Sequence, residues 1–209
     1  MISQEEGIGI KKKMIQVLVF FLAVGCFGCA SVKVKREEIN KKVDLSGSWN
    51  DTDSRLVAEE MVKDCLLRPW VDVFSAGNGK PPVIILGAIV NRTSEHINAQ
   101  LFLSDLENNL LNSGKVKFVA GKQQRQELRD EKQDQAENAS RITVKPRKEE
   151  TGADFMLQGS INSVKDEISG KYVILYQVNL ELVDLTTNEK AWIGQKEIKK
   201  VVSRRSFGF

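Results

Sequence analysis

The spacing of hydrophobic residues changes several times along the chain, and each change predicts a new element. Residues 51–68 carry apolar side chains at three- and four-residue steps, as the buried face of a helix does, and Pro69 is expected to end this helix. Residues 82–90 form a continuous apolar run, whose length and branched side chains predict a strand buried on both faces. The polar residues 91–98 then predict a loop.

The middle of the chain predicts two further helices around one short strand. Helical spacing returns at residues 97–113, and the next strand is expected at residues 116–120. Residues 123–139 are so polar that we expect a surface helix there. The inward face of the first of these helices is expected to carry Leu101, Phe102, Leu106, Leu110 and Leu111.

Alternation of apolar and polar residues in the last third predicts three strands, at residues 153–166, 171–185 and 190–201. Short turns separate these strands, so we expect an antiparallel meander. The order α-β-α-β-α-β-β-β predicts a single small α/β mixed (α+β) domain, in which helices pack on a mixed sheet. One face of the middle strand is expected to carry Tyr172, Ile174, Tyr176, Val178, Leu180 and Leu182.

The N-terminal segment predicts export. Three lysines at residues 11–13 precede an apolar run at residues 14–24, which is too short to span a bilayer of roughly 30 Å but has the length of a signal-peptide core. Cys26 follows a glycine at the end of this run, which resembles the lipobox, where signal peptidase cuts before a cysteine that carries a diacylglycerol. We therefore expect a lipoprotein signal peptide at residues 1–25 and a lipid on Cys26. Cys29 is the alternative site, and an ordinary secretory signal with unrelated cysteines also stays open.

The residues after the signal are charged and lack apolar periodicity. Residues 26–45 therefore predict a lipidated N-terminus with a flexible tether, and residues 46–209 predict a globular domain. Fully extended, the stretch from Cys26 to Asp51 reaches at most roughly 80–90 Å. The net charge of +3 over 209 residues is small, so no strong field indicates a nucleic-acid partner.

Candidate catalytic chemistry is sparse. Cys65 lies in an apolar helical face and is expected to be a buried thiol, and the single histidine, His96, leaves no metal-ligand spacing. Ser94, Glu95 and His96 are consecutive, so they cannot point at one another as a nucleophile, a base and an orienting group must. We therefore expect no catalytic residue, no metal and no cofactor.

Three other features each have a structural and a functional interpretation. The polar residues 50–54 suit a helix cap, made by Asp51 or Asp53, or else a ligand or partner patch. Gly87 and Gly159 lie within predicted strands and indicate bulges or close backbone packing, or else room for a ligand. The lysine-rich residues 196–205 are typical of a guarded edge strand, or of a contact with anionic lipid headgroups or an acidic partner.

Several separated blocks resemble one known family in sequence and in order. The blocks are LSGSWNDTDSRLVAEEMVKDCLLRPW, SEHINAQLFLSDLENNLLNSGKVKFV, ETGADFMLQGSINS and TNEKAWIGQKEIKK. They resemble the LpoB family of outer-membrane lipoproteins that activate penicillin-binding proteins, over about residues 45–205. The resemblance implies a fold similar to the N-terminal domain of TolB.

The resemblance also implies a function. The protein would be a non-catalytic lipoprotein on the periplasmic face of the outer membrane, held there by its N-terminal lipid. It would bind a regulatory domain of a bifunctional penicillin-binding protein and stimulate peptidoglycan synthesis. Better-known members have a long disordered linker, whereas this tether is short. An alternative therefore stays open, an envelope scaffold or adaptor that binds another cell-envelope protein or a glycan.

A partner-binding surface is expected where aromatic and arginine side chains project from helix ends and loops. Two such places stand out, the end of the first helix and the loop after the first strand. Our candidates for partner binding are Arg68, Trp70, Arg92, Glu95 and His96.

Overall fold

The computed structural model describes residues 34–38, 41–146, 148–168 and 170–203. The chain divides into two compact units, Met1–Lys41 and Lys42–Phe209. In the first unit, the Glu37 carboxylate pairs with the ammonium groups of Lys35 at 2.9 Å and Lys41 at 2.7 Å. The predicted signal peptide and both candidate lipid-attachment sites, Cys26 and Cys29, lie outside the described residues.

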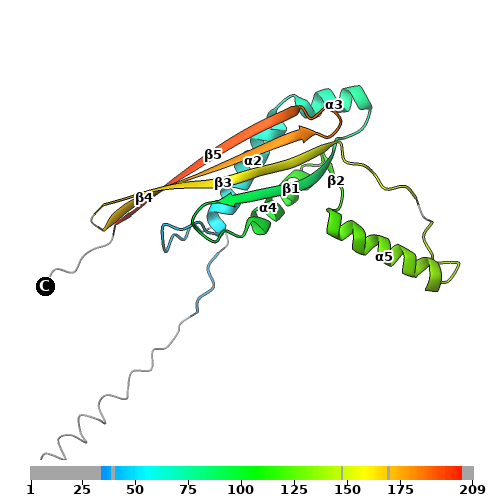
Figure 1. Cartoon of the computed structure of the whole chain (residues 1–209), viewed down its shortest axis with the longest axis horizontal. Coiled ribbons are helices and arrows are strands. Elements are labelled where there is room, and N and C mark those ends of the chain that lie inside the picture. Colours follow the sequence, from blue (N-terminus) through cyan, green and yellow to red (C-terminus); the bar gives the residue numbers. More distant parts are fainter. Residues whose placement is uncertain (1–33, 39–40, 147, 169, 204–209) are drawn as a thin grey trace, which may run out of the picture. The chain divides into compact units, whose positions relative to one another are not determined.

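The second unit alternates helices and strands before it ends in three long strands (Figure 1). Its elements are α2 (Asp51–Leu67), α3 (Trp70–Asn78), β1 (Val83–Arg92), α4 (Ala99–Asn112), β2 (Lys117–Phe118), α5 (Lys122–Asn138), β3 (Phe155–Ile168), β4 (Lys171–Asp184) and β5 (Lys190–Ser203).

The five strands form one sheet in the order β2-β1-β3-β4-β5. Strand β1 runs parallel to both β2 and β3, whereas β4 runs antiparallel to its two neighbours, β3 and β5. The predicted mixed sheet with a terminal antiparallel meander is therefore confirmed. The strongly polar α5 has no buried residue and extends away from the sheet in Figure 1, as expected for a surface helix.

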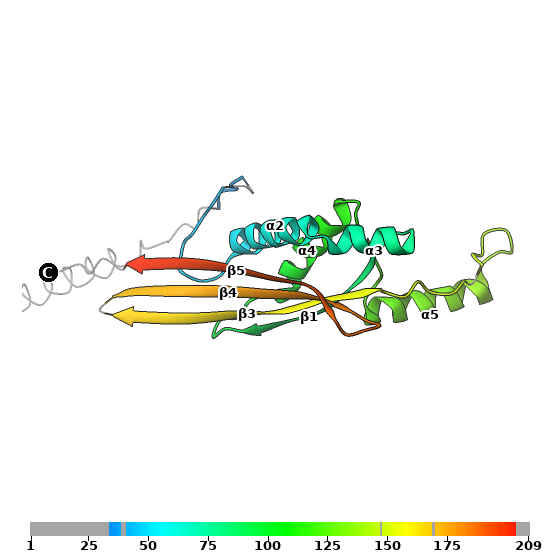
Figure 2. The same cartoon turned by 90° about the horizontal axis from the view of Figure 1, so that it is seen from above.

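Helices α2, α3 and α4 lie on one face of the sheet (Figure 2), and the core lies between these helices and the sheet. The alternation in β4 is as predicted, because Ile174, Tyr176, Val178, Leu180 and Leu182 are buried, and Tyr172 packs against them from the end of the strand. No helix of the described residues covers the opposite face of β1, β3, β4 and β5, which we call the open face.

The start of α2 corrects one prediction. The cap is Asn50 and neither of the two aspartates, because its side chain accepts the backbone N–H of Asp53 at 3.1 Å. The Asp53 carboxylate in turn accepts the backbone N–H of Asn50 at 2.9 Å, which completes a capping box. The polar residues 50–54 thus satisfy the helix terminus.

Pro69 ends α2, but helical structure resumes at the next residue. The prediction missed α3 because Pro69 has helical dihedral angles and serves as the N-cap of this second helix. A proline tolerates that place, since the first turn of a helix leaves its N–H groups unbonded in any case.

The buried face of α4 and the end of β1 also differ from the prediction. In α4, Leu103 is buried while Leu101 and Leu111 are 46% and 48% exposed, so the inward face lies along Phe102, Leu103, Leu106 and Leu110. Strand β1 continues through Arg92, which we had expected in a loop, because its last residues pair with β3 up to Asn162.

The two strand glycines have structural roles. The register between β1 and β3 shifts at Gly87, where an added Cβ would meet the side chain of Met156 at 3.0 Å. A Cβ at Gly159 would collide with the backbone carbonyl oxygen of Asn179 on β4. The predicted bulge and close backbone packing are therefore confirmed.

Candidate functional site

The loop between β1 and α4 is tied to the core through Glu95. One carboxylate oxygen accepts the Tyr176 hydroxyl at 2.5 Å, and the other accepts the backbone N–H of Trp49 at 3.0 Å. Burial, and then the hydrogen bond to Glu95, raises the pKa of Tyr176, so its hydroxyl stays protonated and donates. Glu95, one of the predicted partner contacts, therefore supports the loop from inside.

Asn91 closes the loop upon itself. Its amide group donates to the backbone carbonyl of Glu95 at 2.8 Å, while its side-chain oxygen accepts the N–H of Thr93 at 2.9 Å. Residues 91, 93 and 95 are half-buried, and Arg92, Ser94 and His96, which alternate with them, are exposed. The loop therefore holds three polar side chains outward on a fixed support, as a binding loop requires.

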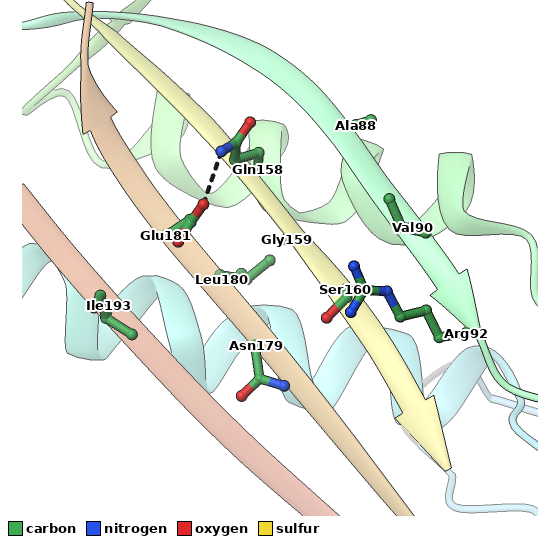
Figure 3. Close-up of a pocket in the computed structure, with 10 residues that line it drawn as sticks. All are labelled: Ala88, Val90, Arg92, Gln158, Gly159, Ser160, Asn179, Leu180, Glu181 and Ile193. Atoms are coloured by element: carbon green, nitrogen blue, oxygen red, sulfur yellow. Dashed lines mark hydrogen bonds between the residues drawn. The ribbon is translucent and has the colours of Figure 1, made fainter. Parts of the chain in front are cut away.

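Arg92 projects from the end of β1 over the open face. Figure 3 shows its guanidinium directed toward Ser160 on β3, beside a shallow depression of about 340 Å³. Nearby, the Gln158 amide donates to Glu181 at 2.7 Å, and Lys190 pairs with the same carboxylate at 2.5 Å. The residues around this depression include Ala88, Val90, Arg92, Gln158, Ser160 and Glu181. We call the exposed loop side chains and this depression the Arg92 surface.

Arg68 and Trp70 lie at the other end of α2. The Arg68 guanidinium pairs with Asp64 at 2.5 Å, and Asp64 also accepts the indole N–H of Trp192 at 2.9 Å. These hydrogen bonds, Arg68 first, hold the pKa of Asp64 below its ordinary value. The N-terminal end of α2 begins next to Trp49, whose N–H binds Glu95. At a rise of about 1.5 Å per residue, Arg68 is roughly 25 Å from that end of the helix.

The structure corrects the proposed role of Trp70. Only 8% of its surface is exposed, its indole N–H donates to the backbone carbonyl of Cys65 at 2.8 Å, and its ring packs edge-on against Phe155. An indole held this way leaves little surface for a partner. Trp192 is buried too, at 6% exposure.

The remaining polar clusters have structural partners. Lys200 reaches across from β5 and pairs with Asp53 at 2.6 Å and Asp44 at 2.8 Å. Burial opposes the charge on Lys200, but the hydrogen bonds to both aspartates outweigh it and raise the pKa of its ammonium. The Trp49 indole donates to Ser54 at 2.8 Å. A ligand would have to break these pairs to bind here.

Reactive groups are few in the part of the chain that the structure describes. Burial raises the pKa of the Cys65 thiol to about 12, which leaves it protonated and unreactive at neutral pH. The described residues contain no cluster of three His, Cys, Asp or Glu residues suited to a metal ion. None of the described helices is both long and apolar enough to cross a membrane.

Sequence reasoning found the exposed loop but missed its supports. Tyr176 was predicted as a core residue without its bond to Glu95, and the role of Asn91 was missed. The polar residues that face outward on β4, such as Glu181, were visible as the other half of its alternation. That pattern is the signal that could have indicated the open face as a surface for contacts.

Binding residues lie disproportionately on loops that a rigid scaffold positions, and the braced loop between β1 and α4 is such a loop. The sequence profile of the family described as "Peptidoglycan-synthase activator LpoB" matches residues 53–198, and the chain belongs to this family. The resemblance found from the sequence is confirmed. The family description is that of an activator of an enzyme. No curated protein sequence matches the chain.

Several solved structures are similar to the chain at low identity. The LpoB C-terminal domain from Escherichia coli has a TM-score of 0.35 and 20% identity, covering 68% of this chain and 97% of that chain. The solution structure of E. coli LpoB has a TM-score of 0.38 and 17% identity, with coverages of 86% and 87%. Lipoprotein GNA1162 from Neisseria meningitidis has a TM-score of 0.38 and 13% identity, with coverages of 61% and 88%.

Proposed function

We propose that this protein is a non-catalytic lipoprotein that binds and activates a bifunctional penicillin-binding protein and so regulates peptidoglycan synthesis. The observation that carries the proposal is the family match over residues 53–198. The N-terminal lipid, on Cys26 or alternatively Cys29, would hold the protein on the periplasmic face of the outer membrane. The mass of the mature N-terminus tests the anchor, and an unmodified N-terminus beyond Ala30 would rule it out.

The Arg92 surface is the binding site that the geometry favours. Arg92 and His96 are exposed, and the loop between them is braced by Asn91 and Glu95, so binding would order few side chains. A guanidinium on a fixed support is a frequent hot spot in protein interfaces. Arg68, although exposed, is engaged with Asp64 and lies at the far end of α2.

Glycan polymerisation by the organism's own bifunctional synthase, with and without this protein, tests the proposal. Replacing Arg92→Ala is expected to weaken binding by about 2 kcal/mol while the melting temperature stays nearly unchanged. The matched control is Arg141→Ala, which removes an exposed arginine from the segment after α5. If saturating protein neither binds nor accelerates the synthase, the activator role is wrong.

The short tether limits where the partner can be met. Between Cys26 and Lys42 an extended chain reaches roughly 55 Å. A synthase domain would therefore have to approach the outer membrane, or the partner is another envelope protein or a glycan. Capture from solubilised membranes by the lipidated protein, followed by identification of what Arg92→Ala no longer retains, distinguishes these partners.

A further inference from the structure

Strands β3, β4 and β5 run well beyond the helices at one end of the sheet (Figure 2). On the open face of this end, Val164, Ile168 and Val201 are 68%, 75% and 69% exposed. The cross-strand register places Val164 opposite Leu175, and Val201 opposite Val173, so these side chains share one face. We call residues 164–168, 171–175 and 199–203 the sheet tip. Its exposed apolar side chains form a cluster, and such clusters mark contact sites.

Lysines surround the apolar side chains of the sheet tip. Lys171 and Lys199 are exposed on the same face, and within the described residues the structure gives neither of them an ion pair. One carboxylate, that of Asp166, shares this face, opposite Val173. On the other face, Lys165 pairs with Glu167 at 2.6 Å. The open-face side of the sheet tip therefore combines valine and isoleucine with a small excess of positive charge.

The chain enters the domain beside the sheet tip. Lys200 holds Asp44 at 2.8 Å and the backbone carbonyl of Ser48 at 3.0 Å. Gly47 lies so close that an added Cβ would meet Val202 at 2.7 Å and the Tyr172 ring at 2.9 Å. A membrane anchor at the N-terminus would therefore draw this end of the domain toward the membrane first.

We propose that the sheet tip is a second membrane contact, which rests on the phospholipid surface with Val164, Ile168 and Val201 among the headgroups and Lys171 and Lys199 beside lipid phosphates. This proposal rests on the proposed N-terminal anchor. The lipid is favoured over a protein occupant because the N-terminal segment, which would carry the anchor, joins the domain at this end. Apolar side chains flanked by lysines also suit the interface between acyl chains and headgroups.

The contact would set the height of the Arg92 surface. Strand β1 ends at Arg92 opposite Asn162, and β3 continues from there to Ile168 at the sheet tip. At about 3.3 Å per residue along the strand, Arg92 would stand at most roughly 20 Å above the lipid. A partner that uses the Arg92 surface would then have to come within that distance of the membrane.

Depth-dependent quenching on the full lipidated chain tests this contact. A fluorescent amino acid is incorporated at Ile168, or at Thr186 in the turn at the opposite end, and the protein is reconstituted into vesicles of phosphatidylethanolamine and phosphatidylglycerol with a nitroxide on the headgroup. We expect at least threefold more quenching at position 168 than at position 186. The double substitution Val164→Glu and Val201→Glu should reduce quenching at position 168 to the level at position 186. Val73→Glu, which alters an exposed valine on α3, should leave it unchanged.

Vesicle flotation separates the two proposals. If the chain does not float with the vesicles, the anchor is wrong, and the sheet-tip contact falls with it. If the chain floats but positions 168 and 186 are quenched equally, the anchor stands and the sheet-tip contact is overturned. Equal quenching together with weaker synthase activation by the double variant would assign the sheet tip to a protein partner instead. A circular dichroism melt checks that each variant is folded.

Discussion

The hydroxyl of Tyr176, on the buried face of β4, donates a hydrogen bond to Oε1 of Glu95 in the β1–α4 loop at 2.5 Å. The same hydroxyl lies 3.1 Å from the backbone carbonyl of Gly47. A single buried oxygen thus connects the sheet, the exposed loop and the segment that enters the domain. The bond explains why Arg92 and His96 project from a loop that is braced on its inner side.

Replacing Tyr176→Phe should lower the free energy of unfolding by about 1–3 kcal/mol, because the half-buried Glu95 loses a donor. Chemical denaturation measures the change. Tyr172→Phe is the matched control, two inward positions away on β4, and it should change stability by less than about 0.5 kcal/mol. Equal losses in both variants would contradict a special role for the Tyr176 hydroxyl.

Lys200→Met should destabilise the domain by about 3 kcal/mol, because it leaves the carboxylate of Asp53 without its cation. Asp53 is only 5% exposed, so water cannot replace the ammonium at 2.6 Å. Lys199→Met removes the neighbouring exposed lysine and should have an effect below about 0.5 kcal/mol. The comparison of their urea midpoints decides the point, and a tolerated Lys200→Met would show that the pair contributes nothing.

Acidification should destabilise the domain through carboxylates whose pKa is lowered in the folded state. Asp64 is one of them, held by Arg68 and then Trp192, and Glu181 is another, held by Lys190 and then Gln158. A lowered folded pKa means that the stabilisation is complete above the pKa of the unfolded chain and is lost as the pH falls through the folded value.

Urea midpoints measured from about pH 5 to about pH 3 should therefore fall for the natural sequence. Asp64→Asn retains an acceptor for the Trp192 indole but no longer titrates, so its midpoint should fall less over the same range. Parallel curves for the two proteins would mean that Asp64 does not contribute to the acid response.

Two glycines should respond to alanine in opposite directions. Gly159→Ala should cost about 2 kcal/mol or more, because the new methyl group overlaps the carbonyl of Asn179 on the adjacent strand. Gly77→Ala should stabilise by about 0.5–1 kcal/mol, because an added Cβ in α3 meets no atom within 4 Å and alanine favours helix. Thermal melts of both variants, measured side by side, test the pair.

The sequence by itself determined the elements whose pattern is local. The strict alternation of β4 predicted its buried face because neighbouring residues on a strand point to opposite sides, whatever the strand pairs with. The polar composition of α5 likewise predicted a helix with no buried side. The block resemblance identified the family because it depends on residues in order and not on their contacts.

Only the tertiary structure decided which polar residues are supports and which are free to bind. Glu95 and His96 are adjacent and equally polar in the sequence, yet Glu95 turns inward because Tyr176, 81 positions away, offers it a donor. Trp70 was as plausible an anchor as Arg68 until the ring of Phe155 on β3 was placed against it. Such contacts join residues remote in the chain, and local spacing carries no information about them. The same reason explains the sheet tip, since Val164 and Val201 come to share one face only when β3, β4 and β5 pair in register.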